Sequence, residues 1–404
     1  MLKIATVLFL ITFTVATNAQ AQPNLTLLPS CAELCMGALS NGSICVPMDP
    51  LCICNNEQAL KLVNTCVQST CTVVEQLSAK NITQTLCGAP VRDRTMLISG
   101  FGLGGGVVAT LAFALRLFSR VKSKATSCGM DDYIMALAML AILPFSGLSI
   151  VLAHNGLGKD IWTLQPEQIT RVLYVYYIDE SLYLASTALT KISILYFYLR
   201  IFPDRFFRGA TLALVSSCMA YQIAFILVSV FQCRPISAAW EHWDGEHPGS
   251  CNNVNIQGWT CAVINIVLDV CILLLPMPQL STLSMSLGRK ARLLAVFGVG
   301  VFVTLVSILR LESLINFAKS RNPTWDYVPM GYWSTIEVHT GVVCACMPAI
   351  SSLIFKRAQT PARNGENCGA NRAPRGEGKQ DSSVHITQAS LELELISRFS
   401  DDTV

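Results

Sequence analysis

Seven long apolar segments follow one another along most of the chain, separated by short polar stretches. They occupy residues 96–115, 133–153, 172–201, 209–233, 257–280, 293–315 and 328–355. A helix rises about 1.5 Å per residue, so about 20 apolar residues cross the roughly 30 Å hydrocarbon layer of a bilayer. A segment in lipid must also satisfy its own backbone polar groups, which a helix does. The pattern predicts seven transmembrane helices and an all-α fold.

The chain divides into four parts, one of which contains the seven spans. Residues 1–21 contain Lys3, an apolar run and Ala19-Gln20-Ala21, which is typical of a secretory signal peptide cleaved after Ala21. A signal anchor that stays attached is the alternative. Residues 22–94 predict a small cysteine-rich domain, and residues 95–357 hold the seven spans. Residues 358–404, rich in Gly, Arg, Asn and Ser, predict a disordered cytoplasmic tail.

The composition agrees with a membrane protein. Only 14% of the residues are charged and 52% are hydrophobic, and the mean hydropathy is +0.48. These values exclude a soluble enzyme and a disordered or fibrous protein. No hydrolase triad, phosphate-binding loop or zinc motif rises above chance, so we expect no enzyme. The net charge of +3 is too small and too dispersed to indicate a nucleic-acid partner.

The cysteines of residues 22–94 predict a disulfide-bonded domain. They stand at positions 31, 35, 45, 52, 54, 66, 71 and 87, and glycosylation sequons begin at Asn24, Asn41 and Asn81. Small domains with too little apolar core are held by disulfides in oxidising compartments, and the sequons indicate a glycosylated ectodomain. A zinc site is the competing interpretation, which eight thiols without histidine in a secreted segment disfavour.

The spacing of the cysteines narrows the 105 pairings that eight cysteines allow. Cys31 and Cys35 lie on one predicted helix, and Cys66 and Cys71 follow from another. Two antiparallel helices joined by two disulfides would use these four cysteines. Cys45 and Cys52 could then close the loop between the helices, which leaves Cys54 for Cys87. The predicted disulfides are Cys31–Cys71, Cys35–Cys66, Cys45–Cys52 and Cys54–Cys87.

The same cysteine pattern resembles the fungal CFEM domain. The resemblance rests on Pro29-Ser30-Cys31-Ala32-x2-Cys35, Cys45, Asp49-x2-Cys52-Ile53-Cys54, Cys66, Cys71 and Cys87. In CFEM domains that bind haem, an aspartate just before the fourth cysteine is the axial iron ligand, and Asp49 occupies that position. The resemblance therefore implies ferric haem as a candidate cofactor, with Asp49 as its metal ligand. The alternative is that Asp49 only orders a turn.

The distribution of basic residues predicts how the chain crosses the membrane. With residues 22–94 outside, the cytoplasmic segments carry more Lys and Arg than the external ones, as the positive-inside rule requires. We expect a multi-pass protein of the cell membrane with an extracellular N-terminus and a cytoplasmic C-terminus. In the external loop between spans four and five, Cys233 and Cys251 predict a disulfide that would fix that loop. Cys261 is the rival partner of Cys251.

The seven spans resemble the fungal rhodopsin-domain family, which includes surface-sensing receptors. The matching residues are Gly156-Leu157-Gly158, Ile161-Trp162, Lys191-Ile192-Ser193-Ile194-Leu195, Tyr198-Leu199-Arg200-Ile201-Phe202, Gln232-Cys233-Arg234-Pro235-Ile236, Trp240, Asp269, Leu275-Pro276-Met277-Pro278, Ser307-Ile308-Leu309-Arg310-Leu311, Trp333, Glu337 and 344–348. The resemblance covers about residues 95–357 and implies a receptor-like protein without naming its ligand.

The family resemblance does not bring a retinal cofactor with it. The seventh span has no lysine for a Schiff base, and the intramembrane Lys191 is expected to snorkel to the cytoplasmic edge. Span three ends in Leu199-Arg200-Ile201 instead of Asp-Arg-Tyr, and span seven has Met347-Pro348-Ala349 instead of Asn-Pro-x-x-Tyr. A heterotrimeric G protein is therefore a candidate partner without its usual contact motifs.

Ionisable residues inside the spans provide the candidate ligand site. Such charges cost about 3 kcal/mol or more each unless they are paired or hydrated. Counted from the outer ends of their helices, Glu180, Arg310 and Glu337 lie at similar depths, and His339 is two residues after Glu337. The functional interpretation is an externally open polar pocket in which Arg310 counters Glu180 or Glu337. The alternative is a buried ion pair that only fixes helix packing.

Three functions agree with these features. The first is a cell-surface receptor that senses an extracellular or host-surface ligand. The second is haem or iron capture by the CFEM domain. The third is a transporter, which the lack of a convincing internal repeat disfavours. The expected partners are the lipid bilayer and an unidentified extracellular ligand.

Overall fold

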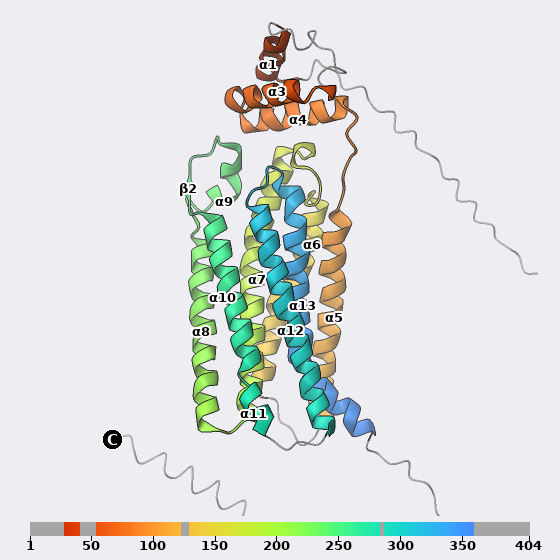
Figure 1. Ribbon diagram of the computed structural model, residues 1–404, viewed down its shortest axis with the longest axis vertical. Helices are drawn as coiled ribbons and strands as arrows, with labels where there is room; N and C mark the ends of the chain where they lie inside the picture. The colour runs from red at the N-terminus through yellow and green to blue at the C-terminus, as the bar shows by residue number, and fades with distance from the viewer. Residues whose placement is uncertain (1–27, 41–53, 123–128, 283–286, 359–404) are drawn as a thin grey trace, which may run out of the picture. The chain divides into compact units, whose positions relative to one another are not determined.

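The computed structural model describes residues 28–40, 54–122, 129–282 and 287–358. The predicted signal peptide, the tail, Asp49, Cys45, Cys52, Asn24 and Asn41 lie outside these ranges. The described residues form an N-terminal helical module followed by a bundle of seven long helices (Figure 1). The all-α prediction is confirmed.

The N-terminal module consists of α1 (Ser30–Ser40), α3 (Glu57–Thr70) and α4 (Val73–Leu86). The Asn56 side chain begins α3 by accepting hydrogen bonds from the backbone N–H groups of Gln58 and Ala59, at 3.0 and 3.2 Å. Thr72 and Glu75 form a capping box at the start of α4. These caps satisfy backbone donors that have no partner inside the helix.

Disulfides tie the helices of this module together. The structure forms Cys31–Cys71, Cys35–Cys66 and Cys54–Cys87, three of the four pairs expected from the spacing. The fourth expected pair lies outside the described residues. The small core comprises Leu28, Ala32, Cys35, Met36, Ala59, Val63, Val67, Cys71 and Ala79. A core of this size needs covalent links, and the first two disulfides join α1 to the end of α3. Asn81 of the third sequon is exposed on α4.

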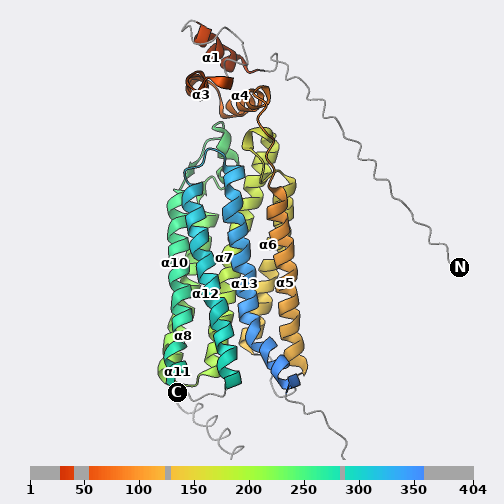
Figure 2. The ribbon, with the colours of Figure 1, turned by 45° about the vertical axis from the view of Figure 1, so that its right-hand side comes forward.

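Seven long helices run alongside one another in the bundle (Figures 1 and 2). They are α5 (Thr95–Lys122), α6 (Met130–His154), α7 (Pro166–Ile201), α8 (Arg205–Val230), α10 (Val254–Leu274), α12 (Leu287–Phe317) and α13 (Pro323–Ala358). Successive helices alternate in direction. We call the two ends of the bundle the Thr95 end and the Lys122 end, after the first and last residues of α5.

Each predicted span corresponds to one of these helices. Within the described residues, α5, α6, α7, α8, α12 and the segment 254–279 that begins with α10 are long and apolar enough to cross a membrane. The seventh helix, α13, corresponds to the predicted span 328–355, and Val342 and Cys346 on it are completely buried. Because α13 packs among the other helices, it can carry polar residues that a lipid-facing helix cannot.

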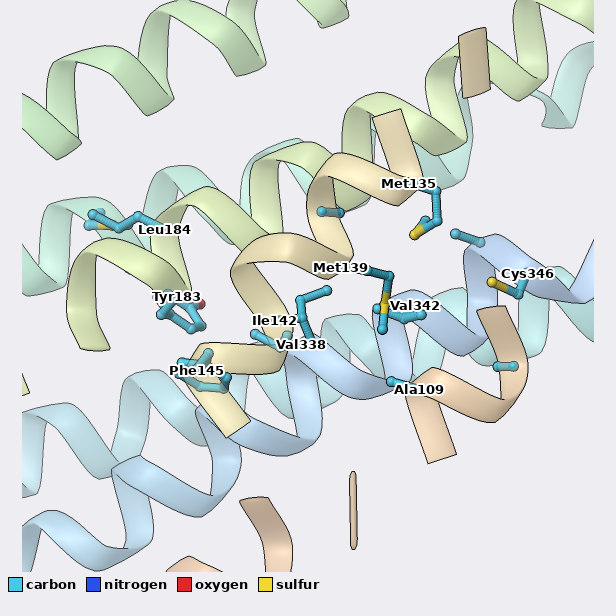
Figure 3. Close-up of a cluster of buried hydrophobic side chains, with 14 residues drawn as sticks. Ala109, Met135, Met139, Ile142, Phe145, Tyr183, Leu184, Val338, Val342 and Cys346 are labelled. Carbon is cyan, nitrogen blue, oxygen red and sulfur yellow. The ribbon is translucent and has the colours of Figure 1, made fainter. Parts of the chain in front are cut away.

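The main core of the bundle joins α5, α6, α7 and α13 (Figure 3). Ala109 of α5 belongs to this core with Met135 and Ile142 of α6, and all three side chains have no exposed surface. Phe145 packs near Tyr183 of α7, with ring centroids 6.4 Å apart. Close packing against α6 and α13 fixes the position of α7 in the bundle. The polar side chains of α7 therefore face defined partners.

The connections at the Thr95 end form a hydrogen-bonded cap. Gly158 has φ +106°, and a Cβ there would lie 2.8 Å from the backbone carbonyl carbon of Arg94. The Gly158 N–H donates to Thr324 O at 2.9 Å, and its carbonyl accepts from the Arg94 N–H at 2.9 Å. Only glycine adopts this conformation without strain, which explains the second glycine of the Gly156-Leu157-Gly158 motif.

The remaining connections contain short helices and strands. At the Thr95 end they include η2 (Ile161–Thr163), β1 (Cys233–Arg234), α9 (Ala238–Glu241), η3 (His242–Asp244) and β2 (Ser250–Cys251). Strands β1 and β2 pair antiparallel, and the predicted disulfide Cys233–Cys251 joins them. The rival Cys261 is buried on α10 and lies 2.9 Å from the Tyr221 hydroxyl. At the Lys122 end, α11 (Met277–Thr282) follows α10.

Candidate functional site

Glu337 of α13 is the centre of a buried polar cluster. Its Oε2 accepts a hydrogen bond from the Tyr183 hydroxyl of α7 at 2.9 Å. Its Oε1 accepts from Asn265 Nδ2 of α10 and from Ser307 Oγ of α12, both at 2.7 Å. One carboxylate therefore joins four helices, and the side chain is only 3% exposed. Hydrogen bonds to an ionised group are shorter and stronger than neutral ones.

Arg310 of α12 supplies the positive charge of this cluster. Its Nη1 lies 4.0 Å from Glu337 Oε2, and its Nε donates to Ser334 Oγ at 2.9 Å. The guanidinium also lies over the Tyr183 ring, 4.1 Å from its centroid, which is a cation–π contact. Of the two predicted counterions, Glu337 is therefore the one that Arg310 contacts. We call these residues, with Asn265 and Ser307, the Glu337 cluster.

Glu180 lies across a small cavity from Arg310. The cavity has a volume of about 40 Å³ and is lined on α7 by Tyr176, Asp179 and Glu180, together with Arg310 and others. Neither Asp179 Oδ1 nor Glu180 Oε2 has a hydrogen-bond partner among the described residues. A cavity of this size holds a few water molecules, so an enlarged pocket would require movement of its walls. We call it the Glu180 cavity.

His339 is not part of this cluster, contrary to the sequence prediction. Its Nε2 lies 2.8 Å from Ser146 Oγ of α6, and its ring fills the space beside Gly105 of α5. Two residues along a helix correspond to a rotation of about 200°, so His339 and Glu337 occupy opposite faces of α13. Their proximity in sequence and depth suggested a common pocket, but the helix geometry separates them.

The prediction for Lys191 is also wrong. Its ammonium does not snorkel to an edge, because it forms an ion pair with Asp269 Oδ1 of α10 at 2.9 Å. It also donates to the carbonyl oxygen and to Oδ1 of Asn265, at 3.0 and 2.7 Å. Asn265 thus connects the Lys191–Asp269 pair to Glu337. A continuous polar path runs from Arg310 in the Thr95 half to Lys191 deeper in the bundle.

A second charged cluster lies at the Lys122 end and was not predicted. The guanidinium of Arg116, 1% exposed, binds Asp131 at 2.6 Å and Asp132 at 2.8 Å. Arg120 contacts the same carboxylates at 2.9 and 3.2 Å, and Arg200 lies 3.5 Å from Asp131. We call these five residues the Arg116 cluster. Arg116 also donates to the Ala345 carbonyl of α13 at 2.6 Å, so the cluster joins α5, α6, α7 and α13.

A signal for the Arg116 cluster is present in the sequence. Arg116 and Arg120 are four residues apart and share a helix face, and Asp131-Asp132 begins the next helix. The first span was expected to end at residue 115, which assigned both arginines to a loop and to the count of cytoplasmic basic residues. The helix α5 continues to Lys122 and turns both side chains toward α6.

The connections at the Thr95 end carry a third group of charges. Arg92 forms an ion pair with Asp160, which also accepts a hydrogen bond from Asn322 at 2.7 Å. The backbone N–H and the hydroxyl of Thr95 donate to the Asp93 carboxylate, at 2.8 and 2.7 Å. Because these bonds favour the charged form, they lower the pKa of Asp93. The carboxylate thereby caps the start of α5.

Comparison with known proteins agrees with this architecture. Residues 115–356 match the fungal rhodopsin domain and residues 24–88 match the CFEM domain. An SAT4 family membrane protein of Emericella nidulans is 30% identical over 54% of this chain and 56% of its own length. Receptor GIN3 of Arthrobotrys oligospora is 26% identical over 62% of this chain and 61% of its own. The Metarhizium anisopliae polyenoic acids biosynthesis gene cluster protein Ba17b is 26% identical over 61% and 70%.

The chain spans 56% and 61% of the length of the first two relatives. No solved structure matches the chain. The rhodopsin-domain match covers more than half of the 404 residues and includes every helix of the bundle from the end of α5 onward. The chain therefore belongs to the fungal rhodopsin domain family, as a multi-pass membrane protein that carries a CFEM domain before its helical bundle.

Proposed function

We propose that this protein is a cell-surface receptor that senses an extracellular or host-surface ligand. In this proposal the CFEM domain and the Thr95 end face outward and the Lys122 end faces the cytoplasm. The proposal includes a binding role without catalysis, and a heterotrimeric G protein as a candidate partner. The name of one relative, Receptor GIN3, is in keeping with such a role.

The observation that carries the proposal is that Arg310 pairs with one carboxylate and shares a cavity with another. Arg310 lines the Glu180 cavity together with Glu180, and its Nη1 lies 4.0 Å from Glu337 Oε2. Glu337 is hydrogen-bonded to three other helices, while Glu180 Oε2 has no partner among the described residues. Two arrangements of one cation differ in which helices they hold together, as a two-state element requires.

The proposed mechanism is an exchange of Arg310 between these partners. A ligand that enters from the Thr95 end and favours the Arg310–Glu180 contact would weaken the Arg310–Glu337 pair. Glu337 connects through Asn265 to Lys191 and Asp269, so the change would reach the deeper half of the bundle. A ligand shifts such an equilibrium only by its difference in affinity for the two states.

Charge-removing substitutions test this function. Glu180→Gln removes the alternative partner, so the response to a stimulus is expected to fall at unchanged surface level. Glu337→Gln releases Arg310, so basal signalling is expected to rise and further stimulation to have little effect. Glu312→Gln on the exposed face of α12 is the matched control. The readout is cyclic AMP or kinase activity, together with surface level, in the same cells. Normal stimulated responses in both variants would contradict the proposal.

Haem capture by the CFEM domain is the second candidate function. The CFEM match over residues 24–88 favours it, and Asp49 occupies the position of the iron ligand in haem-binding relatives. Asp49 lies outside the described residues, so haem binding stays a prediction from the sequence.

A further inference from the structure

An elongated cavity lies between α7, α10, α12 and α13, in the half of the bundle toward the Lys122 end. Its volume is about 280 Å³, and its walls include Phe197, Phe297 and Val303. The lining extends from Thr187 of α7 to Phe202, the residue after that helix, and on α13 from Glu337 to Ser351. At about 1.5 Å per residue this is a length of roughly 21 Å. The volume is near the lower end of the roughly 300–1,000 Å³ typical of small-molecule sites. We call it the Lys191 cavity.

The deep end of this cavity is polar and already internally paired. Lys191, Asp269 and Glu337 line it. The three N–H groups of the Lys191 ammonium have three acceptors, namely Asp269 Oδ1 and the two oxygens of Asn265. Lys191 and Arg310 balance the charges of Asp269 and Glu337. A charged ligand would therefore enter an apolar cavity without a free counterion, which is costly.

The remaining hydrogen-bonding capacity at this end is that of an acceptor. A carboxylate offers about four lone-pair sites. Asp269 uses one on Lys191. The Ser307 hydroxyl lies 3.3 Å from Asp269 but donates its one proton to Glu337 Oε1 at 2.7 Å, so sites on Asp269 remain for a donor. The lysine has no donor left to give. A neutral hydroxyl fits this combination, because it donates a hydrogen bond and adds no charge.

We propose that the Lys191 cavity binds an elongated, mostly apolar molecule whose terminal hydroxyl donates to Asp269. The ligand class is a long-chain primary alcohol. This site is separate from the Glu180 cavity, and its occupation does not depend on the receptor role proposed above. A ligand here would hold α12 and α13 against α7 at the Lys122 end.

The test uses the purified full-length protein in lipid nanodiscs and a photoactivatable twelve-carbon alcohol. Mass spectrometry locates the labelled residues, and unlabelled 1-dodecanol competes. We expect labelling of α7, α12 and α13 peptides that line the cavity. The matching methyl ether should label these peptides at least tenfold less, because it lacks the donor and a hydrogen bond to a charged group contributes about 1.5–3 kcal/mol. The matching carboxylic acid should also label them at least tenfold less, because its ionised form would bring a charge without a counterion into the cavity. Equal labelling by all three probes would overturn the proposal.

A cavity-filling variant provides the second arm. Gly341 lines the cavity, and a Cβ there would lie 3.4 Å from Thr190 Cγ2, an ordinary contact. Gly341→Leu should reduce cavity labelling severalfold. The control is Gly147→Leu on the exposed face of α6, where no atom lies within 4 Å of the added Cβ. Labelling that is insensitive to Gly341→Leu in a protein of normal elution volume would overturn the site. If Gly341→Leu does not fold, the comparison of the three probes on the unsubstituted chain decides.

Discussion

The Lys191 ammonium lies 2.9 Å from Asp269 Oδ1, and the two side chains are each only 10% exposed. This pair joins α7 to α10 near the middle of the bundle, where lipid surrounds the helices. Lys191 also donates to both oxygens of Asn265, and the Ser307 hydroxyl lies 3.3 Å from Asp269 Oδ2. The pair therefore combines mutual attraction with an ammonium whose three N–H groups all have acceptors, the condition under which buried charges are tolerated.

Removal of one partner of this pair should be more harmful than removal of both. Lys191→Met leaves Asp269 uncompensated, and we expect a loss of about 3–5 kcal/mol in the free energy of unfolding. The double variant Lys191→Met/Asp269→Leu should recover most of that loss. SDS titration of the protein in lipid–detergent micelles measures the difference. Equal destabilisation of single and double variants would show that the pair adds no specific interaction.

The Arg116 cluster predicts a strict requirement for arginine. Arg116 binds Asp131 and Asp132 through separate guanidinium nitrogens and reaches the Ala345 carbonyl with a third. Lysine has one nitrogen and cannot hold this geometry. We expect Arg116→Lys to be nearly as damaging as Arg116→Ala, about 3–5 kcal/mol in the same unfolding assay.

Arg120 provides the comparison for this cluster. It binds the same carboxylates but is 13% exposed, against 1% for Arg116. Because water reaches Arg120, Arg120→Lys should cost less than about 1 kcal/mol. Similar losses at both positions would mean that burial does not set the requirement for arginine.

Periodicity and spacing predicted the helices, the order of the domains and four disulfides of the described residues, because these depend on local pattern. They predicted that Arg310 meets Glu180 or Glu337, and the structure shows the contact with Glu337, but they did not predict the other charge pairs. Lys191 and Asp269 are far apart in sequence, and their pairing depends on how α7 and α10 pack. His339 was assigned to the wrong face because depth was considered without rotation about the helix axis. Arg116 was missed because α5 extends beyond its apolar segment.

Haem binding by the CFEM domain gives a prediction from the sequence. If Asp49 ligates ferric haem, titration of the full-length protein should shift the Soret band, and Asp49→Ala should abolish that shift. The described disulfides, including Cys54–Cys87, should remain intact in the variant by mass mapping. An unchanged Soret shift in Asp49→Ala would exclude the ligand role, and loss of the native disulfides would support a role in ordering the turn.

Two adjacent glycines of α5 test the packing around His339. A Cβ at Gly105 would lie 2.1 Å from His339 Nδ1, whereas a Cβ at Gly104 meets no atom within 4 Å. The His339 ring is held by Ser146 on its other edge, so it cannot move away without losing that contact. We expect Gly105→Ala to lower the free energy of unfolding by about 1–3 kcal/mol through overpacking.

Gly104→Ala is the control, and it should instead raise the free energy of unfolding by about 0.5–1 kcal/mol, because alanine favours the helix. The double variant Gly105→Ala/His339→Ala removes the clash and should regain stability relative to Gly105→Ala alone. Equal effects of alanine at both glycines would show that the His339 ring does not occupy the space beside Gly105.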